Sequence, residues 1–341
     1  MMIGSEKARL KDLLSMLRAS SGYVSGEYMS KMLKISREAV WKQISMLRGY
    51  GYRIDAKPRL GYMLIDRPDR LYPWEIMYEL GGSTMVKEII YYEDVTSTQD
   101  VALRLAEDGK DSTLVVAEMQ SKGRGRLSRR WISPYGGVWF SLITKPRVSV
   151  RNATLLSLAT ALAVCNTINN NFNIPARIKW PNDVVTNYRK VAGILIDMSV
   201  EHDIIDYCVI GIGINANLSI ESIESMMSDE DRGYYYYGST SLMHEMGRAV
   251  DRLKFVASLL KELESIYSKL SYKDEILASI RAMMLFGPVS IIEGEGKDVK
   301  TRDGVAVDVD GDGSLLVKTD EGLERITSGY VHIRYDKIHK V

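Results

Sequence analysis

Cysteine is scarce in this sequence of 341 residues. The two cysteines, Cys165 and Cys208, stand among apolar residues, and the sequence contains no CxxC pair. These counts do not indicate a disulfide framework. We expect both thiols to be small buried hydrophobic groups in a reducing cytosol.

Long apolar runs are missing as well. No stretch of about 18 apolar residues is present, which excludes an ordinary membrane-spanning helix. No charged segment followed by an apolar run opens the chain, so no signal peptide is indicated. The sequence therefore predicts a cytoplasmic protein with no membrane partner.

The chain also lacks an overall charge, because its formal net charge is only +1. The charges are unevenly distributed, however. Residues 1–70 hold 14 lysines and arginines against 7 acidic residues, which leaves the remainder of the chain at −6. A basic segment on a nearly neutral chain indicates an anionic partner for that segment. The length predicts two or three domains.

The first 66 residues have the pattern of a winged helix-turn-helix. Apolar spacing and Ser36 as an N-cap predict three helices, over 5–20, 25–33 and Arg37–Arg48. Two short strands follow, Tyr52–Ala56 and Tyr62–Ile65. Residues expected to meet duplex DNA lie on the third helix and the wing: Arg37, Trp41, Lys42, Arg48, Lys57 and Arg59. The alternative is a helical cap that supports the rest of the chain.

A polar, proline-containing linker, residues 66–70, precedes a second domain over 71–282. Its pattern mixes strands and helices, which favours an α+β domain with a mixed or mostly antiparallel sheet. Residues 221–240, with four tyrosines at 234–237, are expected to form a long surface loop. Short strands with Gly/Asp turns predict a small β domain over 285–341. The expected strands and helices of the second domain are Glu88–Tyr92, Leu114–Gln120, Val138–Thr144, Ala176–Trp180, Val191–Ser199, Tyr207–Ile214, Thr98–Glu107, Ala153–Asn169 and Leu253–Leu270.

The strongest chemical signal is the glycine- and arginine-rich segment 122–131, KGRGRLSRRW. Glycine lets a backbone approach an anion closely, and arginine presents a planar fork of donors to phosphate oxygens. The segment therefore suits a triphosphate or an acyl phosphate. Taken alone, it fits a solvated basic loop or a nucleic-acid-binding arm equally well.

Two further motifs contain lysine. In KWPND at 179–183, Lys179 could meet a phosphate, and Asn182 and Asp183 could hold magnesium or the nucleotide. Pro-Asn-Asp is by itself an ordinary turn. In RKVAGILI at 189–196, Lys190 begins an apolar strand, where a charge at a strand end is common.

Two other motifs are decoys. GIGINA at 211–216 fits G-x-G-x-x-A, but no convincing helix follows it, so a dinucleotide site is rejected. Small residues at a strand end over a ligand explain it better. DVDGDG at 308–313 resembles the start of an EF-hand loop. The twelfth position is Thr319 instead of glutamate, so the segment is expected to be a β-turn.

In order along the chain, Ser97-Thr98, Gln120, GRGR at 123–126, KWPND, RKVAGIL and GIGIN resemble the catalytic domain of the biotin–protein ligases. The N-terminal segment also resembles the DNA-binding domain of the bifunctional class, which joins a biotin operon repressor to the ligase. The C-terminal segment matches that family's SH3-like β-barrel in position and length. The resemblance implies a class II synthetase-like ligase domain with ATP and Mg²⁺ as cofactors and biotin as substrate.

The resemblance assigns roles to individual residues. Lys190 and Arg126 would act in catalysis. The expected biotin contacts are Ser97, Thr98, Gln120, Arg124, Gly125, Arg126 and Lys190. The expected ATP contacts are Arg126, Arg129, Lys179, Asn182, Asp183 and Asn215, with Asp183 as a magnesium ligand. The family commonly has Asn where this chain has Gln99, and it carries a tryptophan in a loop where this chain offers Tyr234–Tyr237.

The implied reaction adenylates biotin and then transfers it to a lysine of a biotin carboxyl carrier protein. Duplex DNA and a second copy of the chain are the other expected partners. Two alternatives remain: a repressor that senses a small ligand without ligase activity, and a lipoate-type acyl ligase. A pure sensor needs no ATP site, and Gln120 with Arg124 suits a polar ureido ring better than a dithiolane.

Overall fold

The computed structural model describes residues 4–146, 148–228, 238–293, 300–327 and 331–334. The chain divides into two compact units, residues 1–70 and 71–341. No helix among the described residues is both long and apolar enough to cross a membrane.

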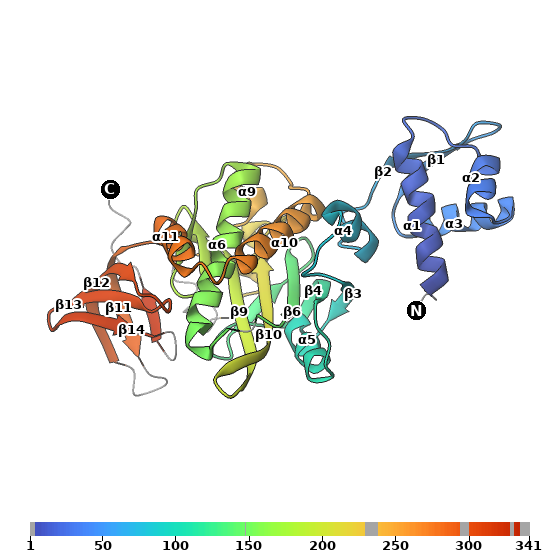
Figure 1. Cartoon of the computed structure of the whole chain (residues 1–341). Coiled ribbons are helices and arrows are strands. Elements are labelled where there is room, and N and C mark those ends of the chain that lie inside the picture. Colours follow the sequence, from blue (N-terminus) through green and yellow to red (C-terminus); the bar gives the residue numbers. More distant parts are fainter. Residues whose placement is uncertain (1–3, 147, 229–237, 294–299, 328–330, 335–341) are drawn as a thin grey trace. The chain divides into compact units, whose positions relative to one another are not determined.

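The first unit is a three-helix bundle with a β-hairpin (Figure 1). Its elements are α1 (Gly4–Ala19), α2 (Gly26–Leu33), α3 (Arg37–Gly49), β1 (Arg53–Lys57) and β2 (Gly61–Asp66). Ser36 caps α3 as expected, because its Oγ accepts from the backbone N–H of Ala39 at 3.1 Å. Val40, Ile44 and Leu47 are buried on one face of α3. The helical period of the apolar residues therefore located this core from the sequence.

The second unit is built on an eight-stranded mixed sheet with the strand order β3-β4-β6-β10-β9-β8-β7, and β5 lies off this path, paired with β4. β3 and β4 are parallel, and the other pairs are antiparallel. The strands are β3 (Glu88–Val95), β4 (Thr113–Arg124), β5 (Arg130–Ser133), β6 (Val138–Thr144), β7 (Ala176–Lys179), β8 (Asp183–Thr186), β9 (Arg189–Glu201) and β10 (Ile204–Ile214).

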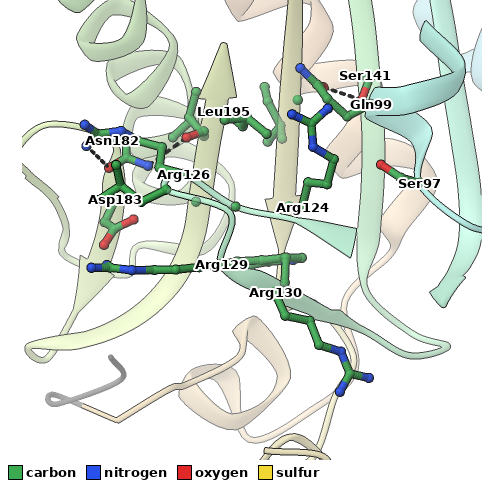
Figure 2. Close-up of a pocket in the computed structure, with 18 of the residues that line it drawn as sticks. Ser97, Gln99, Arg124, Arg126, Arg129, Arg130, Ser141, Asn182, Asp183 and Leu195 are labelled. Atoms are coloured by element: carbon green, nitrogen blue, oxygen red, sulfur yellow. Dashed lines mark hydrogen bonds between the residues drawn. The ribbon is translucent and has the colours of Figure 1, made fainter. Parts of the chain in front are cut away.

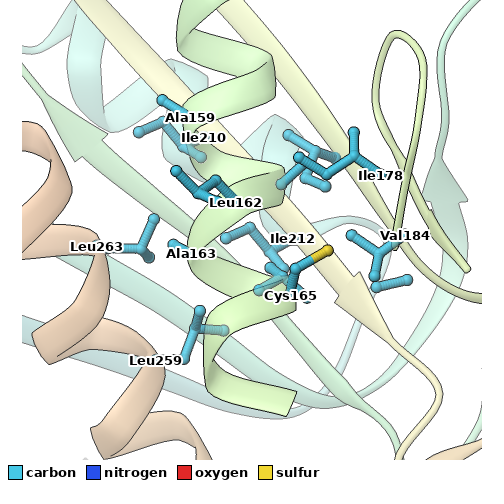
Figure 3. Packing of buried hydrophobic residues seen from close by; sticks show 14 of the residues in the cluster. Ala159, Leu162, Ala163, Cys165, Ile178, Val184, Ile210, Ile212, Leu259 and Leu263 are labelled. Atoms are coloured by element: carbon cyan, nitrogen blue, oxygen red, sulfur yellow. The ribbon is translucent and has the colours of Figure 1, made fainter. Parts of the chain in front are cut away.

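Helices cover both faces of this sheet. Alternation along β4 places Leu114 and Val116 in the main core and Val115 in a smaller core on the opposite side, against α5. The main core contains residues of α6 and α10 packed over β10, β7 and β8 (Figure 3). The helices are α4 (Pro73–Leu80), α5 (Thr98–Glu107), η1 (Val150–Asn152), α6 (Ala153–Phe172), α7 (Ile220–Ser225), α9 (Leu242–Met246), α10 (Arg252–Ser268) and α11 (Lys273–Met283).

Both cysteines are free and buried in this main core. Burial raises the pKa of the Cys208 thiol to about 12. The expectation of unpaired, buried thiols is therefore confirmed.

The surface loop expected over 221–240 is partly wrong. Residues 220–225 form α7, because Ser219 caps the helix and Ile223 packs with Trp131, Trp139 and Leu218. Ser239 and Thr240 are buried. The four tyrosines at 234–237 lie outside the described residues.

The last five strands form one antiparallel sheet in the order β14-β13-β12-β11-β15. They are β11 (Gly287–Glu293), β12 (Lys300–Val309), β13 (Leu315–Thr319), β14 (Gly322–Ile326) and β15 (Val331–Arg334). A closed barrel was expected. Among the described residues, β14 and β15 are instead the two edge strands of the sheet and do not pair with each other. The segment that resembled an EF-hand is the turn between β12 and β13, and Arg325 forms ion pairs with Asp310 and Asp312.

Candidate active site

A cavity opens over the middle of the large sheet. The cavity together with its open mouth spans about 1030 Å³. Strands β4, β6, β9 and β10, the start of α5, the arginine-rich loop and the KWPND turn all contribute to its lining. Segments as far apart in the sequence as Ser97 and Gly213 therefore meet in one place (Figure 2).

One end of the cavity is lined by uncharged hydrogen-bonding side chains. Gln120 Oε1 accepts from the Thr98 backbone N–H at 2.8 Å and from Thr98 Oγ1 at 3.0 Å. Ser141 Oγ donates to Gln99 Oε1 at 2.8 Å, and it also lies 3.0 Å from Thr98 Oγ1. Ser97 caps α5 through Asp100 N. A network of this kind fixes the direction of each donor and acceptor before a polar ligand arrives.

Arg124 is a charged side chain beside this otherwise uncharged end, and Figure 2 shows it extending toward Gln99 and Ser141. Its Nη1 is 2.8 Å from Asp100 Oδ1 and 3.3 Å from Asp197 Oδ2. Asp197 also accepts from Gln99 Nε2 at 3.1 Å. Arg124 therefore links α5 to β9 across the uncharged end.

The other end gathers positive charge around one carboxylate. Lys190 Nζ lies 2.7 Å from Asp183 Oδ1, and Lys179 Nζ lies 3.6 Å from Asp183 Oδ2. Arg126 Nη1 donates to Asn182 Oδ1 at 3.3 Å, and Arg129 extends toward Asp183 in Figure 2. The cations outnumber the carboxylate, so this cationic end favours an anion.

Burial shifts the pKa values of two cations at this end of the cavity. Burial lowers the pKa of Lys179, and the negative charge of Asp183 opposes that shift. Burial likewise lowers the pKa of Arg126, again opposed by Asp183. A partly desolvated cation interacts more strongly with an incoming phosphate than an exposed one does, because water screens it less.

The arginine-rich loop turns sharply between the two ends. Gly125 N donates to Arg129 O at 2.7 Å, and Leu127 and Ser128 both have left-handed backbones with φ of 54° and 55°. A left-handed backbone costs a residue with a side chain roughly 1–3 kcal/mol. This turn directs Arg126 and Arg129 to the cationic end, whereas Arg130 points away from it in Figure 2.

Glycines in β10 explain the GIGIN motif. A Cβ at Gly211 would come within 2.4 Å of Gln99 Oε1, and a Cβ at Gly213 within 2.4 Å of Trp131 Nε1. Both glycines therefore make room for side chains that cross the floor of the cavity. This agrees with the rejection of a dinucleotide site.

Almost all residues expected from the sequence to bind biotin or ATP line the cavity, and Asn215 is the exception. The amide of Asn215 is buried and donates to Thr240 O at 2.9 Å. Its contact with a nucleotide stays a prediction, as do the individual roles of the other residues.

Sequence reasoning assigned no role to Trp131, Ser141 or Asp197. The Trp131 ring lies 4.9 Å from Lys190 Nζ, a distance typical of a cation–π contact. Trp131 ends the arginine-rich segment, which is a signal that could have been used. Ser141 lines the cavity from β6, and Asp197 on β9 contacts Arg124 and Gln99, but no local sequence pattern shows either position.

Comparison with known proteins agrees with this site. Residues 91–215 match the Biotin/lipoate A/B protein ligase family, residues 9–63 match an HTH domain, and residues 286–334 match the Biotin protein ligase C terminal domain. The fold and cavity thus define an acyl ligase joined to a helix-turn-helix.

Individual relatives narrow the class. The bifunctional ligase/repressor BirA of Bacillus subtilis is 35% identical over 332 residues, covering 95% of this chain and 98% of the relative. The BirA of Escherichia coli is 28% identical over 93% of this chain and 95% of its own length. Biotin protein ligase from Aquifex aeolicus, solved with biotin and ATP, has a TM-score of 0.60 and 31% identity, covering 73% of this chain and 99% of that one. The chain belongs to the biotin protein ligase family, in its bifunctional ligase/repressor branch.

Proposed function

We propose that this protein activates biotin with ATP and transfers it to a lysine of a biotin carboxyl carrier protein. The observation that carries the proposal is the cavity itself, in which an uncharged hydrogen-bonding end adjoins a cationic end. The first end suits the ureido ring of biotin. The second suits the triphosphate together with the carboxylate that must attack it.

The first step joins two anions, and this dictates what the protein must supply. The biotin carboxylate attacks the α-phosphorus of ATP, a P–O bond forms, and pyrophosphate leaves, giving biotinyl-5'-AMP. Fixed positive charge and in-line positioning lower the barrier, because negative charge spreads over the phosphoryl oxygens in the transition state. We propose that Lys190 and Arg126 provide this charge, supported by Lys179 and Arg129.

The second step uses no nucleophile of the protein. A lysine amine of the carrier attacks the carbonyl carbon of the mixed anhydride, an amide bond forms, and AMP leaves. Water competes for the same anhydride, so the cavity must exclude it. Gly125 and its neighbours, which turn across the cavity beside Arg124, are placed to contribute to this exclusion.

Magnesium fits this site as a partner of the phosphates. Among the described residues no group of three acidic, histidine or cysteine side chains could hold a metal alone. Mg²⁺ commonly binds one or two carboxylates together with substrate phosphates and water. Asp183, with Asn182 beside it, is the residue that would hold the ion. When bound, the ion would neutralise phosphate charge.

ATP–pyrophosphate exchange tests the proposal. We expect exchange that depends on biotin and is not supported by lipoate. Exchange supported by lipoate would indicate a lipoate-type ligase. Biotin binding without any exchange would indicate a ligand-sensing repressor instead.

We further propose that residues 1–66 bind duplex DNA and repress biotin genes, and that two copies of the chain act together on paired half-sites. Arg37, Lys42 and Trp41 are exposed on α3, with Trp41 55% exposed, and Lys57 and Arg59 are exposed at the hairpin. Arg48 is used partly within the unit, because Nη2 donates to Ile54 O at 2.8 Å. The reduced, buried cysteines fit a location in the cytoplasm.

A further inference from the structure

Arg189 is the one residue of the RKVAGIL motif whose charge the proposed mechanism does not use. It does not appear among the described residues that line the cavity. Its Nη2 donates instead to Glu245 Oε1 at 2.8 Å. Glu245 lies on α9, between the segments that match the two ligase family models.

The Glu245 carboxylate collects hydrogen bonds from three separate residues. Besides Arg189, it accepts from Asn187 Nδ2 at 2.6 Å and from Thr240 Oγ1 at 2.5 Å. The side chain of Glu245 is only 7% exposed, so water screens these contacts weakly. Charge-assisted hydrogen bonds of this kind are stronger than neutral ones. Glu245 therefore fixes the turn before β9 and the segment before α9 to one another.

The segment over 238–240 in turn holds the main chain of Lys190. Lys190 N donates to Gly238 O at 3.2 Å, and Thr240 N donates to Lys190 O at 2.9 Å. β10 pairs with β9 only as far as Ala192, so at Lys190 this segment takes the place of a neighbouring strand. On the other side of β9 the pairing with β8 shifts register beside Val185, which pairs with Lys190.

Where the pairing of two strands shifts register, the hydrogen bonds between them are locally disrupted, so they fix the position of the strand backbone less tightly. The backbone of Lys190 therefore depends on the 238–240 segment. Glu245 holds this segment through the Thr240 hydroxyl, and Asn215 holds it through the Thr240 carbonyl. The Lys190 ammonium group has to meet both Asp183 and the reacting phosphate. A displacement of about 1 Å in such a group can cost ~10²-fold in rate.

We propose that Glu245, paired with Arg189, is a positioning residue that sets the place of Lys190 for adenylation. The proposal rests on the proposed function of Lys190. It assigns Glu245 no contact with biotin or ATP. It predicts that loss of Glu245 lowers the rate of the adenylation step and leaves the uncharged end of the cavity intact.

The test compares Glu245→Ala with a matched control, Glu264→Ala. Glu264 also accepts three hydrogen bonds, from Ser83 Oγ, Thr84 N and Thr84 Oγ1, but it lies on α10 and outside the cavity lining. Both variants and Glu245→Gln are assayed for kcat and KM in biotin-dependent ATP–pyrophosphate exchange. Biotin affinity is measured by calorimetry without ATP, and folding by thermal unfolding.

We expect Glu245→Ala to lower kcat by about tenfold or more relative to Glu264→Ala. Biotin affinity should fall by clearly less than kcat, because only Lys190 among the expected biotin contacts is displaced. The kcat of Glu245→Gln, which keeps an acceptor but loses the charge, should lie between those of Glu245→Ala and Glu264→Ala. Arg189→Ala should lower kcat similarly, and the double variant should be no worse than either single one, because the two side chains act as a pair.

The proposal is overturned if Glu245→Ala matches Glu264→Ala in kcat, or if the effects of Arg189→Ala and Glu245→Ala simply multiply. A loss of biotin affinity as large as the loss of kcat would also overturn it, because it would show general disruption of the site. The wild-type assay keeps the two proposals distinct. If the unaltered protein shows no biotin-dependent exchange, the proposed function fails independently of Glu245.

Discussion

Asp183 is the residue around which the charges of the cavity are arranged. It lies within 4 Å of both lysine ammonium groups, at 2.7 Å for Lys190 and 3.6 Å for Lys179. A single carboxylate keeps the lysines in place before substrate binds, and it leaves a surplus of positive charge. At the scale of single residues, the positions of these charged side chains therefore determine where an anionic substrate can bind.

Lys190→Ala is expected to abolish most adenylation while the protein stays folded. Removing a preorganised donor to developing negative charge typically costs ~10²–10³ in rate. The measurement is biotin-dependent pyrophosphate exchange, with thermal unfolding as the control for folding. A rate within about a factor of three of the wild type would show that Lys190 does not stabilise the transition state.

Nucleotide binding is expected to take up a proton through Lys179. Burial lowers the pKa of Lys179 in the free protein, and a bound triphosphate would raise that pKa again. Between the two pKa values the free lysine is neutral and the bound one is charged, so ATP affinity should fall as the pH rises through this interval. Calorimetry over a series of pH values, in two buffers with different ionisation enthalpies, measures this uptake.

Lys179→Arg is the control for this prediction. Arginine stays protonated at all accessible pH values in water, so the variant should show less proton uptake on binding ATP. Equal uptake in the two proteins would assign the proton to another group.

At the scale of elements, the turn between β12 and β13 reaches the KWPND segment. Trp180 Nε1 donates to Gly313 O at 2.9 Å, and Trp180 lines the cavity just before Pro181, Asn182 and Asp183. Arg281 Nη2 also donates to Val309 O at 2.6 Å. The C-terminal sheet thus supports the cationic end of the site through Trp180.

Gly313→Ala is expected to weaken both stability and the use of ATP. Gly313 has φ of +91°, and a Cβ there would lie 2.7 Å from Leu155 N in the backbone of α6. We expect a loss of roughly 1–3 kcal/mol in the free energy of unfolding. We also expect a higher KM for ATP in pyrophosphate exchange.

Gly311→Ala in the same turn is the matched control. A Cβ at Gly311 would have no heavy atom within 4 Å, and the backbone there has no positive φ. This variant should behave like the wild type in urea unfolding and in exchange. If Gly313→Ala also keeps the wild-type KM for ATP, the turn does not support the KWPND segment.

The whole molecule combines a basic N-terminal unit with a ligase unit of opposite net charge. Residues 1–70 have their own buried core, which includes Leu13, Met29 and Ile44. A separate core lets this unit fold without support from the ligase unit. Binding of DNA and ligation of biotin are therefore expected to be separable by deletion.

Deletion of residues 1–66 is expected to abolish DNA binding and to preserve biotin transfer. In the intact protein, log K for DNA should fall with log salt by ~0.9 for each phosphate neutralised. The measurements are binding to the upstream DNA of the gene at two salt concentrations, and biotin transfer to a carrier protein. DNA binding that ignores salt, or that survives the deletion, rules out this role. A collapse of transfer would support the helical-cap alternative.

The sequence by itself determined those helices and strands whose apolar residues repeat with a clear helical or strand period. The predicted helix Thr98–Glu107 and strand Val138–Thr144 have the bounds observed for α5 and β6, because their apolar spacing is set within a few residues. It also indicated an anion site, although only the ordered set of motifs did so, because each motif taken alone fits an ordinary loop, turn or strand end.

Only the tertiary structure decided which side chains meet. Ser141 and Asp197 reach the site because β6, β10 and β9 are neighbours, and no local pattern encodes that order. Residues 220–225 are helical because Ile223 packs against Trp131 and Trp139, which lie far away in the sequence. Glu245 binds Arg189 across 56 residues. Contacts of this kind depend on strand order and packing, so they appear only once the chain has folded.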